Sequence, residues 1–286
     1  DVTACLKHSK TILFADDTTL FISKQNSSLL YSQMNEDLAI LSDWCNSNSL
    51  KVNVAKCNYM LFNEKRGAQT NDDVKMLNTK ILRVATFKLL GIMIDEKLKW
   101  KQHIDHLNKK LSSGLYALRM VKNQTPRNVL KTIYFALIHS HLSYGNLVWG
   151  NAGPTLLKKL IVQQKKAIRL IHKVPYNTTS MPLFTRSRIL PLRQITKLQI
   201  AQILHQLHNR TLPPLIAACF TRHAVTHPHH LRRTAPFRIP LANSTSTHQS
   251  ILNNAHQISR NIPPNLLTLK PSAFKNKFKE LLLSEI

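Results

Sequence analysis

The pattern of apolar positions in the first hundred residues predicts short strands and one helix. Residues 11–23 (TILFADDTTLFIS) consist of two apolar stretches around Asp16 and Asp17, which predicts a β-hairpin with both carboxylates at its tip. Apolar residues at helical spacing then predict a helix from about residue 27, capped by Ser27 or Ser28, to about residue 46. Further strands are expected at 50–53, 59–62, 81–86 and 87–94.

After Trp100 the apolar residues recur three and four positions apart, which is the spacing of amphipathic helices. Pro126 and Pro154 each stand where a helix would begin, because proline is tolerated in the first turn. Helices are expected at about 104–118, 127–142, 154–171, 192–207 and 272–283. Residues 221–250 lose this periodicity and gather Thr, His, Pro and Arg, so a basic and loosely ordered segment is expected there.

Composition narrows the class of protein. The chain has 286 residues, which suggests about two domains, and 43% of them are hydrophobic, which is enough for a sizeable core. The 4 cysteines lie far apart without a C-x-x-C pair, so a reducing compartment fits better than a disulfide framework. The sequence contains no apolar run long enough to predict a membrane-spanning helix. Because the chain opens with Asp1 in mid-pattern, we interpret it as a fragment of something longer.

The charge is strongly asymmetric. The formal net charge is +26, and residues 106–286 contain 26 Lys and Arg but only 2 Asp and Glu. A helical surface normally mixes both signs, so this omission of acid indicates a polyanionic partner. Nucleic acid is the leading candidate and an anionic membrane surface the second. A basic surface without a partner is the remaining alternative.

The Asp16–Asp17 pair is the sharpest chemical feature. Adjacent carboxylates repel each other unless cations neutralise them, and hard divalent ions prefer oxygen ligands. Two such ions can drive in-line phosphoryl displacement. The alternatives are an ordinary Asp-rich turn and an aspartyl phosphohydrolase, whose D-x-D spacing is absent here.

Several ordered motifs resemble the reverse transcriptases of non-LTR (LINE-type) retrotransposons. Residues 14–18 (FADDT) look like the family's aromatic-Ala-Asp-Asp motif, with Phe where Tyr is commoner. Other segments that resemble the family in the expected order are 50–57 with 59–62, 87–95, 99–104, 144–150 and the tail around Arg233, 237–238 and 273–275.

This resemblance implies an α+β fold: a partial palm with β-hairpins, followed by an all-α basic thumb and C-terminal region. The implied domains are the C-terminal half of the palm at 1–99, a helical thumb at 100–175, and a basic, mainly helical C-terminal region at 176–286. Asp16 and Asp17 would be catalytic and would bind Mg²⁺, with Mn²⁺ as an alternative. Lys56 would lie near the phosphates of the incoming nucleotide.

The resemblance also implies contacts with substrates. Leu90 and Gly91 would hold the primer end through their backbone. Basic helices would follow the template–primer duplex through phosphate contacts made by Lys101, Lys109, Lys110, Arg119 and Lys122. The partners implied are an RNA template, a DNA primer and a dNTP, with no membrane and no small organic cofactor. The implied location is intracellular, in a cytoplasmic ribonucleoprotein and the nucleus.

One departure from the family limits this expectation. Residues 1–10 cannot supply the further metal-binding aspartate that the family places on an upstream strand, so the chain alone is expected not to polymerise DNA. The alternative function is a non-catalytic, basic nucleic-acid-binding remnant.

Other residues that could carry chemistry have simpler explanations. The tryptophans Trp44, Trp100 and Trp149 are expected in the core rather than stacked on bases, because each lies near an apolar stripe. A zinc site is not favoured, since one cysteine in a histidine-rich loop lacks zinc-ligand spacing. Its members would be Cys219, His223, His227, His229 and His230.

Overall fold

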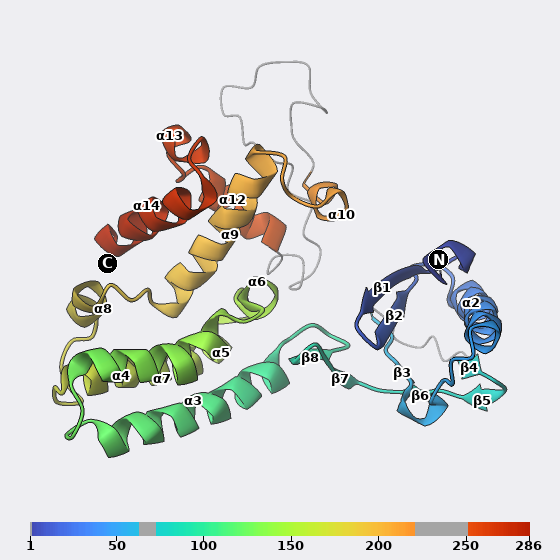
Figure 1. The fold of residues 1–286 in the computed structure, drawn as a ribbon, viewed down its shortest axis with the longest axis horizontal. Helices are drawn as coiled ribbons and strands as arrows, with labels where there is room; N and C mark the ends of the chain where they lie inside the picture. Colours follow the sequence, from blue (N-terminus) through green and yellow to red (C-terminus); the bar gives the residue numbers. More distant parts are fainter. Residues whose placement is uncertain (1, 63–72, 221–250) are drawn as a thin grey trace. The chain divides into compact units, whose positions relative to one another are not determined.

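The computed structural model describes residues 2–62, 73–220 and 251–286. The chain forms two compact units (Figure 1). The first unit contains Asp1–Leu89 with Ile94–Lys97, and the second contains Leu90–Met93 with Leu98–Ile286. The basic segment expected at 221–250, with Arg233 and four of the histidines considered for zinc, lies outside the described residues.

The first unit combines one long helix with small two-stranded sheets. The strands β1 (Lys10–Phe14) and β2 (Asp17–Phe21) pair as an antiparallel hairpin, as the sequence predicts. The other elements are α1 (Val2–Cys5), α2 (Ser27–Ser47), η1 (Val54–Lys56), β3 (Asn58–Tyr59), β4 (Lys75–Met76), β5 (Thr79–Lys80), β6 (Leu82–Arg83) and β7 (Thr86–Leu89). The strand β8 (Ile92–Asp95) begins in the second unit and ends in the first.

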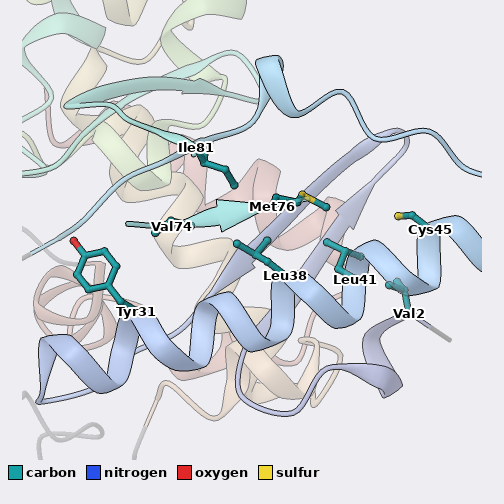
Figure 2. Close-up of a cluster of buried hydrophobic side chains, with 8 residues drawn as sticks. All are labelled: Val2, Tyr31, Leu38, Leu41, Cys45, Val74, Met76 and Ile81. Carbon is teal, nitrogen blue, oxygen red and sulfur yellow. The ribbon is translucent and has the colours of Figure 1, made fainter. Parts of the chain in front are cut away.

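The core of the first unit lies along one face of α2. Leu38 and Leu41 project from this helix toward Met76 of β4, and the cluster is completed by Val2, Tyr31, Cys45, Val74 and Ile81 (Figure 2). Leu20 of β2 packs against the same cluster, so the hairpin attaches to the unit through the face that bears Leu20. The cap of α2 is Asn26, whose side chain accepts the N–H groups of Ser28 and Leu29. The prediction that Ser27 or Ser28 caps this helix is therefore wrong.

The strands after α2 differ from the prediction. Residues 50–53 form no strand, and the strand expected at 59–62 is only the two-residue β3, which pairs in parallel with β6. Val52 instead packs against the core cluster from an irregular segment, and Val54 does so from the short helix η1. Apolar residues without a neighbouring strand to pair with can be buried in this way without forming a ladder. Gly91 lies in the turn between β7 and β8, not inside a strand.

The second unit is helical, and each helix predicted for it is present. Its elements are α3 (Lys101–Val121), α4 (Arg127–Tyr134), η2 (Phe135–His139), α5 (Ser140–Ser143), α6 (Asn146–Trp149), α7 (Pro154–His172), α8 (Met181–Ser187), α9 (Leu192–His208), α10 (Pro214–Ala217), α12 (Ile251–Ser259), α13 (Pro264–Leu267) and α14 (Pro271–Ser284). The chain is thus a mixture of α and β structure, in agreement with the α+β expectation.

Two layers of packing hold the second unit. The long helices α3 and α7 pack against each other through apolar stripes, with Ile104, Leu111 and Leu160 fully buried. The helix α9 packs against α12 and α14, where the His205 ring stacks on Phe274. Between α4 and α5 the segment η2 is a π-helix, an uncommon geometry that is frequent at functional sites.

Burial of the tryptophans follows the prediction. Trp149 is fully buried, Trp100 is buried, and Trp44 is partly buried against the core of the first unit. Among the helices that the structure describes, none is long and apolar enough to cross a membrane.

Candidate catalytic and nucleic-acid-binding residues

The β1–β2 hairpin presents Asp16 and Asp17 at its tip. Phe14 lies opposite Asp17 in the register, which leaves Ala15 and Asp16 as a two-residue turn. Ala15 has a φ of 51°, a left-handed conformation that turns of this length normally give to Gly or Asn. For an alanine this conformation costs roughly 1–2 kcal/mol. Strained turns of this kind are concentrated at functional sites.

Both carboxylates are exposed, and in the described part of the chain neither forms a side-chain hydrogen bond or an ion pair. Their chemistry fits a hard divalent cation, because two neighbouring carboxylates offer oxygen ligands and would gain by neutralisation. In the part of the chain that the structure describes, however, no group of three or more His, Cys, Asp or Glu side chains is placed to hold a metal ion. The pair therefore supplies part of a metal site.

One face of this hairpin is apolar and uncovered. The register places Ile12, Phe14 and Phe21 on the face opposite Leu20, and all three are exposed, Phe14 by 61%. Two-stranded hairpins are marginal on their own and need packing on one face. Among the described residues, that packing is provided on the Leu20 side.

A buried carboxylate fixes the segment that leads into β1. Asp37 of α2 is fully buried and accepts the backbone N–H groups of Lys7 at 3.0 Å, His8 at 3.1 Å and Ser9 at 2.6 Å. These hydrogen bonds outweigh the effect of burial and lower the pKa of Asp37. Neighbouring Glu36 pairs with the Lys7 and His8 side chains at 2.8 and 2.9 Å. Sequence reasoning missed this anchor, although an Asp within the apolar stripe of a helix is a usable signal.

Lys56 lies at the end of the short helix η1 in the first unit, where its side chain is exposed. It belongs to the same unit as Asp16 and Asp17, but among the described residues it forms no ion pair or hydrogen bond with either carboxylate.

The Leu90–Gly91 turn is held by Tyr144 of the same unit. Both residues have positive φ, 46° and 83°. The Tyr144 hydroxyl donates a 2.6 Å hydrogen bond to the Leu90 carbonyl, and a Cβ added at Gly91 would meet the Tyr144 ring at 3.5 Å. The Tyr144 carbonyl in turn accepts the Trp149 indole N–H at 3.0 Å. Tyr144 thus fixes the position of this turn. It is the first residue of the segment 144–150, which resembles the family, but the sequence does not indicate its contact with Leu90.

His103 of α3 holds the strand that follows the turn. Its Nδ1 accepts the N–H of Met93 at 3.3 Å, so the neutral ring carries its proton on Nε2. Burial, with a smaller contribution from His106, lowers the pKa of His103 to about 4. The ring lies 5.5 Å from that of Trp149, which places Tyr144, Trp149 and His103 in one connected support for residues 90–93.

Four of the five cations predicted on α3 are exposed. Lys101 and Arg119 are exposed and stand five turns apart, so they project in the same direction. Lys109 and Lys110 are exposed between them but project around the helix rather than along one line, and Lys122 at the C-cap is half-buried. The structure therefore shows a broadly basic helix surface and not a narrow stripe.

The few carboxylates of the second unit are already paired. Asp105 pairs with Lys159 at 2.6 Å, Glu280 with Arg188, and Glu285 with Lys197 at 3.5 Å. The remaining cations have no further acidic side chain in this unit's sequence to neutralise them. Exposed or half-buried lysines that the prediction did not single out occur on α7 and at its C-cap: Lys158, Lys165, Lys166 and Lys173.

Comparison with known proteins confirms the resemblance seen in the motifs. The chain is 27% identical over 169 residues to the RNA-directed DNA polymerase from the mobile element jockey of Drosophila melanogaster, a match that covers 57% of this chain and 18% of that protein. The probable RNA-directed DNA polymerase from transposon BS of the same organism is 25% identical over 166 residues, again 57% and 18%.

A third relative is the Pol polyprotein from the type-1 retrotransposable element R1 of Bradysia coprophila, with 25% identity over 141 residues, 48% of this chain and 14% of that protein. The chain thus matches less than a fifth of the length of these relatives. No family model matches the chain, and no solved structure matches it. Over about half its length, the chain resembles the RNA-directed DNA polymerases of non-LTR retrotransposons.

Proposed function

Starting from this similarity, we propose that the chain is part of a retrotransposon reverse transcriptase that synthesises DNA on an RNA template. Residues 1–99 are the C-terminal half of the palm, 100–175 the thumb, and 176–286 a basic C-terminal region. The observation that carries the proposal is the strained hairpin tip, which presents two unpaired carboxylates within the FADDT motif. The matches to polymerases of mobile elements support it.

In this proposal Asp16 and Asp17 are ligands of Mg²⁺, or alternatively of Mn²⁺. The bound ions supply Lewis-acid stabilisation of the charge that develops when a nucleotide is transferred. The hairpin presents both carboxylate groups to solvent, and β2 fixes the backbone of Asp17 through its pairing with Phe14. A third acidic ligand must join them, because the described residues offer none beside the pair.

The remaining proposed roles belong to residues that touch substrates. Lys56 places an exposed ammonium for the phosphates of the incoming dNTP, and the Leu90–Gly91 turn holds the end of the DNA primer through its backbone. Lys101, Lys109, Lys110, Arg119 and Lys122 contact phosphates of the template–primer duplex. Such contacts provide affinity without sequence preference.

Metal binding can be tested on the 286-residue chain itself. Dilute Mn²⁺ should broaden the amide NMR signals of residues 14–18 through paramagnetic relaxation. The double substitution Asp16→Asn with Asp17→Asn should abolish the broadening, whereas Asp43→Asn, at an exposed site on α2, should leave it unchanged. Equal broadening in all three proteins would contradict a metal-binding role for the pair.

The second candidate function is nucleic-acid binding without catalysis, which the acid-poor second unit favours. We expect the purified chain to bind a primed RNA template and yet not to extend it with dNTP and Mg²⁺. If 6–10 phosphates are contacted, the affinity should fall about 10³–10⁵-fold between 50 and 200 mM salt. Extension that disappears in Asp16→Asn would show that the chain is itself a polymerase. An affinity that does not change with salt would refute the phosphate contacts.

The two candidate functions can be distinguished in a longer protein encoded by the same transcript. Sequencing the transcript on the 5′ side of the Asp1 codon tells whether an open frame adds an aspartate-bearing strand. If it does, Asp16→Asn in that longer protein should abolish synthesis but leave duplex affinity within about twofold. Synthesis that survives this substitution would refute the catalytic assignment, and an interrupted frame would favour the binding remnant.

A further inference from the structure

Basic side chains from four elements gather around Lys279. Lys275 and Lys279 stand four residues apart on α14 and therefore on the same side of the helix. Lys131 of α4 and Arg188 at the C-cap of α8 both interact electrostatically with Lys279. His139, the last residue of the π-helix η2, interacts with both α14 lysines.

The positive charge of this group is poorly compensated. Lys279 is half-buried, and burial is the main cause that lowers its pKa, with Lys131, Arg188 and Lys275 lowering it further. Glu280 is the single carboxylate that acts in the other direction, and it already forms an ion pair with Arg188. Of the three ammonium groups, Lys279 alone interacts with a carboxylate of the described residues, and that carboxylate already has its own partner. Like charges in such a group repel one another modestly, and a bound anion would remove this repulsion.

His139 adds to this group a buried polar atom without a hydrogen bond among the described residues. Its Nδ1 atom is buried and has no hydrogen-bond partner in the part of the chain that the structure describes. The ring is held against Tyr134 and Phe135, with ring centroids 6.1 and 5.0 Å away. Burial and the two α14 lysines lower the pKa of His139 to about 4, so at neutral pH it adds no repulsion. Its position in a π-helix agrees with the tendency of these segments to mark functional sites.

We propose that Lys131, Lys275 and Lys279, with His139 beside them, form a binding site for a phosphate group. Phosphate oxygens are strong acceptors, and three lysines from two helices can each donate to a different oxygen. Building on the proposed function, the phosphate belongs to the backbone of the bound duplex, so α14 forms part of the nucleic-acid interface. Free phosphate is the other source of the same chemistry.

A matched pair of variants tests the site. Lys275→Gln with Lys279→Gln removes two charges from it, whereas Lys270→Gln with Lys277→Gln removes two exposed charges from the cap and another position of the same helix. Inorganic phosphate, added at constant ionic strength and about tenfold above its Kd, should raise the Tm of the native chain and the control by about 2–4 °C. The site variant should show no rise, and Lys275→Arg with Lys279→Arg should retain it. Equal rises in site variant and control would overturn the proposal, as would loss of the rise in the arginine variant.

The Tm without phosphate checks the premise of uncompensated charge. Because the site variant removes repulsion, its Tm should equal or exceed that of the control. A Tm several degrees lower would show that these lysines stabilise the fold through contacts of their own, which would contradict the proposal.

Duplex binding distinguishes the source of the phosphate. Each phosphate contact contributes about 0.9 to the slope of log affinity against log salt, so losing two contacts should reduce this slope by about 1.8 in the site variant and not in the control. A normal slope together with a lost phosphate response would assign the site to free phosphate and overturn the nucleic-acid assignment. If the native chain binds no duplex, the proposed function is refuted. The Tm measurements with inorganic phosphate still test whether the phosphate site exists.

Discussion

The buried, neutral ring of His103 should make the fold less stable in mildly acidic solution. In the folded chain this ring is 2% exposed and its Nδ1 accepts the Met93 N–H, so the folded state resists a second proton until about pH 4. In the unfolded chain the ring takes up that proton near its ordinary pKa of about 6.5. Between these values the unfolded state binds more protons, and stability therefore falls as the pH falls.

The size of the effect follows from this difference in pKa. A shift from 6.5 to about 4 corresponds to a loss of about 3 kcal/mol once the pH is below both values, and to about 2 kcal/mol at pH 5. Above about pH 7 the contribution is fully present and does not change. His139 and His172 also have lowered pKa values and will add to the acid sensitivity of the native chain, so the contribution of His103 must be measured by difference.

The assay compares the native chain, His103→Gln and His208→Gln by urea denaturation from pH 8 to pH 4.5. His208 is exposed on α9 and serves as the control. The free energy of unfolding of His103→Gln should be lower at pH 8, because a buried acceptor is replaced, but should depend less on pH by about 2 kcal/mol at pH 5. If the native chain and His103→Gln lose stability in parallel as the pH falls, the reasoning is refuted.

Three further substitutions test other contacts. Tyr144→Phe should speed amide exchange at residues 91–93 up to about tenfold, since it removes a hydrogen bond worth about 0.5–1.5 kcal/mol to the Leu90 carbonyl, while Tyr116→Phe, on the exposed side of α3, should not. Asp37→Ala should destabilise the first unit by about 2–4 kcal/mol, because three backbone N–H groups lose their acceptor, whereas Asp43→Ala should change stability by less than about 0.5 kcal/mol. Ala15→Gly should stabilise the hairpin by up to about 1 kcal/mol by relieving the positive φ, and a loss of stability in denaturant titration would contradict the strain.

The helices of the second unit could be predicted because their signals are local. The apolar spacing after Trp100 and the prolines at 126 and 154 determine where α3, α4 and α7 lie, and the structure agrees within a few residues. The π-helical turn at 135–139 could not be predicted, since it depends on how the α4–α5 segment packs against its neighbours. The short helix α8 was missed because seven residues carry too little periodicity.

The candidate site also has parts that the sequence predicts and parts that it does not. The hairpin tip at Asp16 and Asp17 follows from a symmetric pattern around the pair, so it could be predicted from sequence alone. The contact between Tyr144 and the Leu90 carbonyl joins residues 54 positions apart, and no local pattern announces it. The strand expected at 50–53 failed for a related reason, because strand formation requires a partner strand and the local pattern cannot show whether one is present.

The scarcity of acid in the second unit has a consequence for how the protein behaves in solution. With Asp105, Glu280 and Glu285 already engaged, the unit is a folded polycation whose like charges oppose its own compaction. Added salt should therefore raise its melting temperature while it weakens the proposed binding to nucleic acid. One salt titration, followed once by melting and once by duplex binding, should give two responses of opposite sign. The buffer that best stabilises the isolated fold is then the one in which the proposed complex with nucleic acid dissociates most readily.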